Sequence, residues 1–300
     1  MKYLLLISCL IGFSVSFSQV SDSLSQSQQD SIKKIDEAIA HRKNHTDYYV
    51  MRKGKMFFSW GYNRAFYGLS DIHFKGDGYD FTIRDAVAKD RPSKFEPNVY
   101  FNPQLFTIPQ YNFRIGYYIT NKLSLTFNVD HMKYVFQEDQ IATVDGFIDS
   151  SASSRLAGDY DNKLMKVDED FIKYEHTDGL NFLSIDLDYN DLFFETYHRK
   201  FAVDLVAGVS LGATVPKTNA WLFDKKGNDA FHWSGIGMSA NVGLKLFFFK
   251  RFFIHPTVKA GYITMPNVAT NGLENDKASQ NFTFFQWNAT VGYQFRLTNK

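Results

Sequence analysis

Two histidines are the residues whose chemistry best suits acid–base catalysis. His131 directly follows Asp130, and His176 begins the run His176-Thr177-Asp178-Gly179. A hydrolase needs an imidazole within hydrogen-bond reach of a nucleophilic hydroxyl, and a third group that orients the ring. Thr177 adjoins His176, so on an extended strand the two side chains would point to opposite faces. His131 and His176 are therefore weak catalytic candidates, and the alternative is that both are structural.

A second candidate site is the run Asp159-Tyr160-Asp161-Asn162, which spaces oxygen ligands two residues apart, as at the start of a calcium loop. Lys163 follows, and the glycine and glutamate that complete such a loop are missing. The surrounding segment 137–179 holds eleven Asp and Glu against four Lys and Arg. Asp159 and Asp161 are thus weak metal candidates. The alternative is a solvated acidic loop that binds divalent ions loosely, and no cofactor is predicted.

Eight further charged residues, four of each sign, alternate with apolar neighbours. They are Arg114, Asp130, Asp186, Asp188, Asp204, Lys245, Lys259 and Arg296. Side chains alternate faces along a β-strand, so these residues would share the polar face of strands whose other face is apolar. An unpaired buried ion is costly, which favours a paired network that fills a polar interior. A gated path for ions or small solutes along the same charges is the alternative.

The segment Phe285 to Leu297 shows most clearly which element would hold such charges. Every second residue from Phe285 is apolar, and the residues between are polar or glycine, over thirteen positions. This length exceeds the usual soluble strand and suffices for the roughly 9–11 tilted residues that cross a bilayer. Aromatic residues lie toward both ends of the apolar face, as at membrane interfaces. The pattern predicts a barrel strand with lipid outside and a polar lumen inside.

Seven earlier segments repeat this period of two, namely 56–63, 111–120, 123–130, 183–190, 201–215, 236–248 and 252–262. Short connections alternate strictly with long ones, and the long ones lie near 67–109, 137–178, 216–233 and 266–280. This alternation is typical of barrels with tight periplasmic turns and long extracellular loops. The sequence therefore predicts an all-β, antiparallel up-and-down transmembrane barrel of eight strands.

One hairpin leaves the strand number open. Gly76-Asp77-Gly78 predicts a turn between residues 70–75 and 79–84, and we place this hairpin above the membrane in the first loop. If the hairpin spans instead, a partner strand near 99–107 would be needed, despite Pro103 in its middle. Ten strands are the alternative.

The N-terminus predicts export. A positive Lys2, an apolar run from Tyr3 to Phe13 and small residues up to residue 18 have the layout of a cleaved signal peptide, 1–18. The only cysteine lies within it, so the mature chain has neither disulfides nor thiolate metal sites. Residues 19–55 form a polar periplasmic lead-in, with isoleucines at helical spacing near residue 35, and residues 56–297 form the barrel.

Composition supports a membrane barrel. The chain is 17% aromatic, with 30 Phe and 17 Tyr, yet its mean hydropathy is only −0.29. Only half of each barrel strand faces lipid, so an aromatic-rich barrel keeps a low mean hydropathy. A net charge of +1 argues against a nucleic-acid partner.

With its signal peptide, dyad strands, alternating connections and aromatic last strand, the chain resembles the Gram-negative outer-membrane β-barrel proteins of the small OmpA and OmpW types. The resemblance implies residence in the outer membrane, contact with its lipid and lipopolysaccharide, and insertion by the barrel assembly machinery. It also implies that the last strand carries the assembly signal, here Trp287, Tyr293 and Phe295, although residues 297–300 depart from a terminal Phe. Related lipid A deacylases use a His-x-Ser spacing that is absent here, so His131 and His176 would be rim histidines at headgroup level.

These observations favour a non-enzymatic barrel with a filled polar lumen, which acts through its extracellular loops or with a membrane-protein partner. A narrow channel for small or apolar solutes is the first alternative. A hydrolase acting on lipid A or phospholipid at the barrel rim is the second.

Overall fold

The computed structural model describes residues 25–44, 49–102, 104–105, 108–196, 198–223, 225–227, 230–270 and 276–296. The chain divides into two compact units, residues 1–51 and 52–300. In the first unit, helix α2 (Gln26–Asn44) covers the segment whose isoleucines recur at helical spacing. The predicted signal peptide, 1–18, lies outside the described residues. No helix within the described ranges is both long and apolar enough to cross a membrane.

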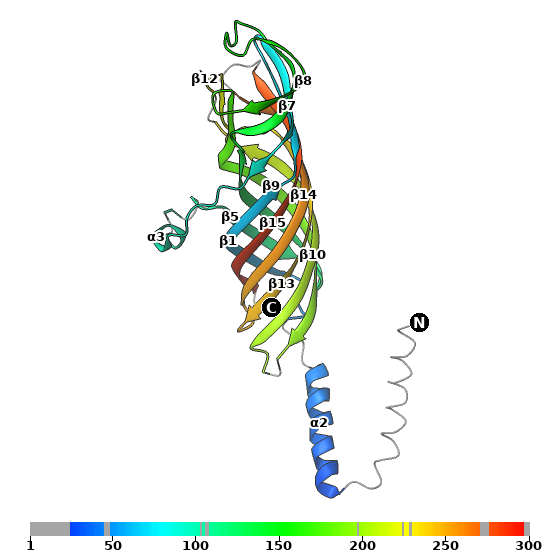
Figure 1. The fold of residues 1–300 in the computed structure, drawn as a ribbon. Helices are drawn as coiled ribbons and strands as arrows, with labels where there is room; N and C mark the ends of the chain where they lie inside the picture. The colour runs from blue at the N-terminus through cyan, green and yellow to red at the C-terminus, as the bar shows by residue number, and fades with distance from the viewer. Residues whose placement is uncertain are drawn as a thin grey trace, which may run out of the picture. The chain divides into compact units, whose positions relative to one another are not determined.

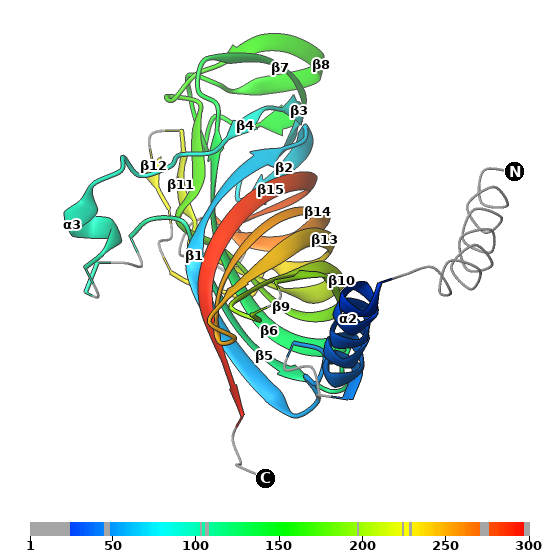
Figure 2. The same ribbon diagram turned by 90° about the horizontal axis from the view of Figure 1, so that it is seen from below.

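The second unit is a closed ring of eight antiparallel strands (Figures 1 and 2). In ring order they are β1 (Lys55–Tyr67), β5 (Tyr111–Tyr118), β6 (Leu123–Phe136), β9 (Ile172–Glu195), β10 (Phe201–Pro216), β13 (Gly235–Phe248), β14 (Phe252–Ala269) and β15 (Lys277–Arg296). The last strand pairs with the first from Lys55↔Arg296 to Tyr67↔Phe284, which closes the ring. The prediction of eight strands is confirmed.

The outward face of the ring is an apolar band. On β15, Phe285, Trp287 and Val291 are exposed, whereas Gln286 and Asn288 between them are buried. The same alternation runs along β10, β13 and β14. A surface of this kind matches the hydrocarbon core of a bilayer, and the polar residues between it face the lumen.

Ring strands β6, β9, β14 and β15 hold 14, 24, 18 and 20 residues, more than the roughly 9–11 that cross a bilayer. Their outer ends join further strands of the same sheet. These further strands are β2 (Ser70–Gly76), β3 (Tyr79–Ala86), β4 (Ala88–Lys89), β7 (Gln140–Ile148), β8 (Gly158–Val167), β11 (Asn219–Leu222) and β12 (Lys225–Lys226). From β15 the sheet runs through β2, β3 and β7 to β8, while β11 pairs with β9 and β4 with β6. We call these strands, with the outer ends of β6, β9, β14 and β15, the extracellular head, which Figure 1 shows at the top.

All four predicted loops differ from the structure because each contains strand residues of the head. Segment 137–178 holds β7, β8 and the start of β9. Its Ala142, Val144 and Ile148 are buried at alternate positions, while its acidic residues other than Glu175 are exposed or half-buried. These acidic side chains lie on the solvent-facing side of the sheet and in the turns between its strands. In the first loop, β2 and β3 form the predicted hairpin outside the ring, and residues 97–100 are helix α3 (Pro97–Tyr100) and not a ninth or tenth strand.

The inward face changes from polar to apolar at one level of the ring. On β6, buried Asp130 is followed on the same face by buried Met132 and Tyr134. On β9, which runs the other way, Phe182 precedes Asp186. Below this level the strands face lipid and enclose mainly polar groups, with the rings of Phe57, Phe247 and Phe253 near the periplasmic end, and above it they face water and enclose a hydrophobic core. The head is thus packed like a soluble protein on top of a membrane barrel.

The head should unfold without the barrel when its core is emptied. Phe81 is 1% exposed and packs against Phe74 and Phe171, with ring centroids 5.3 and 5.5 Å apart. Phe81→Ala should cost about 3–5 kcal/mol of head stability because it leaves a cavity. Trypsin should then cleave at Lys163 and Lys166 of β8, while the barrel keeps its heat-modifiable mobility on a gel. Phe147→Ala, at a residue 42% exposed on β7, is the control and should leave cleavage unchanged.

Candidate functional site

Seven of the eight charges predicted for the lumen lie buried inside the ring. They are Arg114, Asp130, Asp186, Asp188, Asp204, Lys245 and Lys259. The strands that carry them also carry the lipid-facing band, since the two faces alternate residue by residue. Five of these charges belong to two clusters, Lys259 with Asp130 and Asp186 toward the head, and Lys245 with Asp204 toward the periplasmic end.

The cluster nearer the head is built on Lys259. Its Nζ donates to Asp130 Oδ2 at 2.6 Å and lies 3.8 Å from Asp186 Oδ2. Asn112 and Asn128 donate their amide protons to the same aspartate, Asn128 at 2.9 Å. Lys259 and both aspartates are fully buried. Charge-assisted hydrogen bonds of this number can offset the cost of removing the ions from water.

The cluster nearer the periplasm is built on Lys245. Its Nζ donates to Asn190 Oδ1 at 3.0 Å and to Tyr118 Oη at 3.2 Å, and it lies 4.0 Å from the ring centroid of Phe57. In the β10–β13 register it faces Asp204. The ring face supplies a cation–π contact to the buried ammonium.

Arg52, and not Arg296, is buried with Arg114, Lys245 and Lys259 in this interior, which corrects the sequence prediction. Arg52 is 2% exposed, and its Nη2 donates to Asp204 Oδ1 at 2.6 Å. Arg296 faces Lys55 where the wall ends at the periplasmic mouth, so its side chain is exposed despite its inward parity. Arg52 precedes β1 and belongs to no alternating segment, so no strand pattern could have placed it in the lumen.

An aromatic layer covers the upper cluster. It consists of Tyr134, Phe182, Phe282 and Phe284, each at most 3% exposed. Phe182 and Phe284 have ring centroids 6.2 Å apart, and those of Tyr134 and Phe282 are 5.0 Å apart. The Nζ of Lys259 lies 5.9 Å from the ring centroid of Phe182. The polar lumen therefore ends against an apolar floor of the head.

His131 belongs to an aromatic stack on the outer wall. The rings of Trp60 and Tyr111 stack at 4.6 Å and 10°, and those of Tyr111 and His131 at 4.8 Å and 11°. The Nδ1 of His131 bonds Asn181 Oδ1 at 2.8 Å. The stack crosses β1, β5 and β6 near the upper edge of the apolar band. It accounts for His131 as a structural residue of the wall.

His176 lies inside the head and is fully buried. Its Nδ1 lies 3.0 Å from Thr218 Oγ1 and its Nε2 lies 3.1 Å from the side-chain amide of Gln280. Burial lowers the pKa of His176 to about 3. Both ring nitrogens of His176 are therefore engaged by neighbouring side chains inside the buried core of the head.

The predicted metal candidates lie apart from any cluster of ligands. Asp159 and Asp161 are exposed on β8, the edge strand of the head. Within the described parts of the chain, no three His, Cys, Asp or Glu side chains gather as metal ligands would.

Comparison with known proteins gives weak similarities to solved outer-membrane proteins. OprG from Pseudomonas aeruginosa has a TM-score of 0.39 and 12% identity, over 83% of this chain and all of OprG. Neisserial surface protein A gives 0.33 and 12%, over 81% of this chain and 98% of its own. Ail, the attachment invasion locus protein of Yersinia pestis, gives 0.31 and 12%, over 81% and 99%. No family model and no curated protein matches the chain.

These low similarities do not decide the fold. It follows from the strand ring, with its lipid-facing apolar band and its polar interior. The protein has the fold of an outer-membrane β-barrel. Trp287, predicted as part of the assembly signal, is 48% exposed on this band. Tyr293 and Phe295 join an aromatic cluster with Phe58 and Phe252 near the periplasmic end. Their part in assembly stays a prediction.

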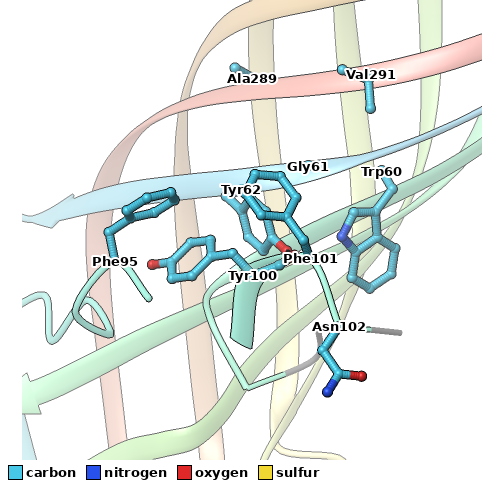
Figure 3. Close-up of a pocket in the computed structure, with 9 residues that line it drawn as sticks. All are labelled: Trp60, Gly61, Tyr62, Phe95, Tyr100, Phe101, Asn102, Ala289 and Val291. Atoms are coloured by element: carbon cyan, nitrogen blue, oxygen red, sulfur yellow. Dashed lines mark hydrogen bonds between the residues drawn. The ribbon is translucent and has the colours of Figure 1, made fainter. Parts of the chain in front are cut away.

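The barrel carries a pocket on its outer wall, which the sequence did not suggest. The segment with α3 projects sideways from the ring (Figure 1) and encloses a cavity of about 600 Å³ against β1 and β15 (Figure 3). Its lining residues are Trp60, Gly61, Tyr62, Phe95, Tyr100, Phe101, Asn102, Ala289 and Val291. Tyr62 fixes the segment, because its hydroxyl donates to Tyr100 O at 2.5 Å. We call this the outer-wall pocket.

Removing Lys259 should destabilise the barrel strongly. Lys259→Met leaves Asp130 and Asp186 buried without their cation and should cost about 3–5 kcal/mol. Adding Asp130→Asn should restore part of this loss, because the most closely paired charge is then gone too. Arg296→Met, at the exposed cation, should change little. The free energy of unfolding in denaturant, measured in detergent micelles, tests this, and equal losses in both lysine and arginine variants would contradict it.

Burial of His176 should make the protein less stable in acid. Between about pH 6.5 and pH 3 the unfolded chain binds a proton at this ring and the folded chain does not, so stability falls as the pH is lowered through this range. His176→Gln should lose less stability than the wild type between pH 7 and pH 4.5. Denaturant unfolding at both pH values measures this, with His198→Gln at an exposed histidine as the control. Parallel curves for wild type and His176→Gln would contradict it.

Proposed function

We propose that the protein is a closed, non-enzymatic outer-membrane barrel that anchors a rigid extracellular head, and that the head binds partners at the cell surface. The observation that carries this proposal is the aromatic layer that seals the charged lumen. A solute entering from the periplasm would meet two paired charge clusters and then the buried rings of Phe182 and Phe284.

The head offers an exposed sheet edge. Strand β8 pairs with β7 and ends the sheet, so its outer edge leaves backbone donors and acceptors for another chain. Beside this edge Ile141 and Leu164 are 70% and 69% exposed, at diagonal positions of the β7–β8 pair. Apolar side chains next to an open edge suit a protein or peptide partner that adds a strand.

The two alternatives find less support. A channel needs a continuous polar path, and the inward face turns apolar above Asp130 and Asp186. A rim hydrolase needs a base, and the contacts of His131 and His176 engage their rings in a stack and in a buried pair of hydrogen bonds.

The closed lumen predicts an electrically silent barrel. Purified protein in a planar bilayer should give no single-channel steps, and liposomes that contain it should not swell in small sugars. Gel mobility before and after heating shows that the inserted barrel is folded, and a porin in the same bilayer is the positive control. Discrete steps whose ion selectivity changes in Lys245→Met would instead establish the channel alternative.

A further inference from the structure

The outer-wall pocket lies where lipid meets protein. Ala289 and Val291 belong to the apolar band of β15, and Trp60 and Tyr62 belong to that of β1. The cavity is almost wholly apolar, and its volume is within the roughly 300–1,000 Å³ of ordinary ligand pockets. Figure 3 shows the rings of Phe95, Tyr100 and Phe101 reaching toward this wall from the projecting segment.

The projecting segment keeps its apolar side chains outward. Phe95 is 66% exposed and Phe101 is 76% exposed, and Ile108 further along is 51% exposed. In water such residues would be poorly placed, whereas beside the apolar band they meet hydrocarbon. The segment thus covers part of the lipid-facing wall, and the pocket beneath it is apolar enough to hold an acyl chain.

A second pocket lies further along β1, toward the head. It is lined along the same two strands by Arg64 to Tyr67 and Trp287, and by Lys89 and Asp90 of the segment that leads to α3. Asp90 is held by the backbone N–H of Ala65 at 3.2 Å. Lys133 lies nearby and is tied to Ser93 Oγ at 3.2 Å. Two cations, Arg64 and Lys89, therefore line this pocket with one aspartate, and Lys133 lies near Asp90 and Asp178 beside it.

We propose that the two pockets form one binding site for lipopolysaccharide, with an acyl chain in the outer-wall pocket and a lipid A phosphate at Arg64 and Lys89. The apolar part is continuous with the lipid-facing wall, and the cationic part lies on its extracellular side. Basic side chains at a membrane surface bind anionic headgroups, and guanidinium matches phosphate in geometry. The excess positive charge selects a lipid with net negative phosphates over a zwitterionic phospholipid.

The site is tested by titrating the refolded barrel in mild detergent and counting bound lipid by native mass spectrometry. The probes are lipopolysaccharide, the same lipid after removal of its lipid A phosphates, and phosphatidylethanolamine. Arg64→Gln with Lys89→Gln should weaken lipopolysaccharide binding by about tenfold, since charge-assisted hydrogen bonds are lost. Phe95→Ala with Phe101→Ala should weaken all acylated probes. Both pairs lie outside the ring interior, and gel mobility reports their folding.

Matched controls separate the site from general effects of charge and exposed rings. Lys163→Gln with Lys277→Gln removes two exposed cations of the head, and Phe193→Ala removes a ring that is 78% exposed on β9. These controls should bind like the wild type. Equal lipopolysaccharide binding in all variants would overturn the proposal, and so would an affinity for phosphatidylethanolamine equal to that for lipopolysaccharide. A barrel dimer that disappears with the Phe95 and Phe101 changes would also overturn it, because a second copy of the chain would then occupy the pocket. A conducting barrel would refute the closed lumen and leave this result unaffected.

Discussion

The structure depends on a change of solvent along single strands. Ring strands such as β9 and β15 leave the bilayer and continue into water without a break. Their outward faces must therefore change from apolar to polar, and their inward faces must change in the opposite sense. The level at which Asp130 gives way to Met132, and Asp186 to Phe182, is where both changes occur. The sealed lumen, the packed head and the shape of the apolar band all follow from this one level.

Within the membrane the sequence was sufficient to predict the strands, because lipid and lumen impose opposite polarity on neighbouring residues and the period of two is strong. In the head the sequence was not sufficient to predict them. Segment 140–148 also alternates, but its inward residues include Ala142 and Gly146 and its outward residues include Thr143, so the contrast in hydropathy is weak. The acidic residues on either side of this segment then led to the prediction of a loop. Tertiary pairing with β3 supplies the stability that the local pattern does not show.

The features that sequence reasoning missed are those that no period marks. Arg52 enters the lumen from a turn, and its place depends on Asp204, which is 152 residues away in the chain. The projecting segment holds Pro92, Pro97 and Pro109, so it has neither strand nor long-helix periodicity. Its position is set by Tyr62 and Tyr100, a contact between a ring strand and a short helix. The positions of Arg52 and of the projecting segment depend on contacts with the closed ring, so they can be assigned only from the three-dimensional structure.

Charges that neither conduct nor catalyse still have a physical reason to remain in a sealed lumen. A slip of one residue between neighbouring strands would turn Lys259, Asp130 and Asp186 toward lipid, where a charged side chain costs several kcal/mol. An apolar filling of the lumen would carry no such penalty, and a slipped ring would then bury lipid-like residues on both faces. The paired network therefore favours one register more strongly than it stabilises the ring. That register also sets Trp60 beside Tyr111 and aligns the two halves of the outer-wall pocket on β1 and β15.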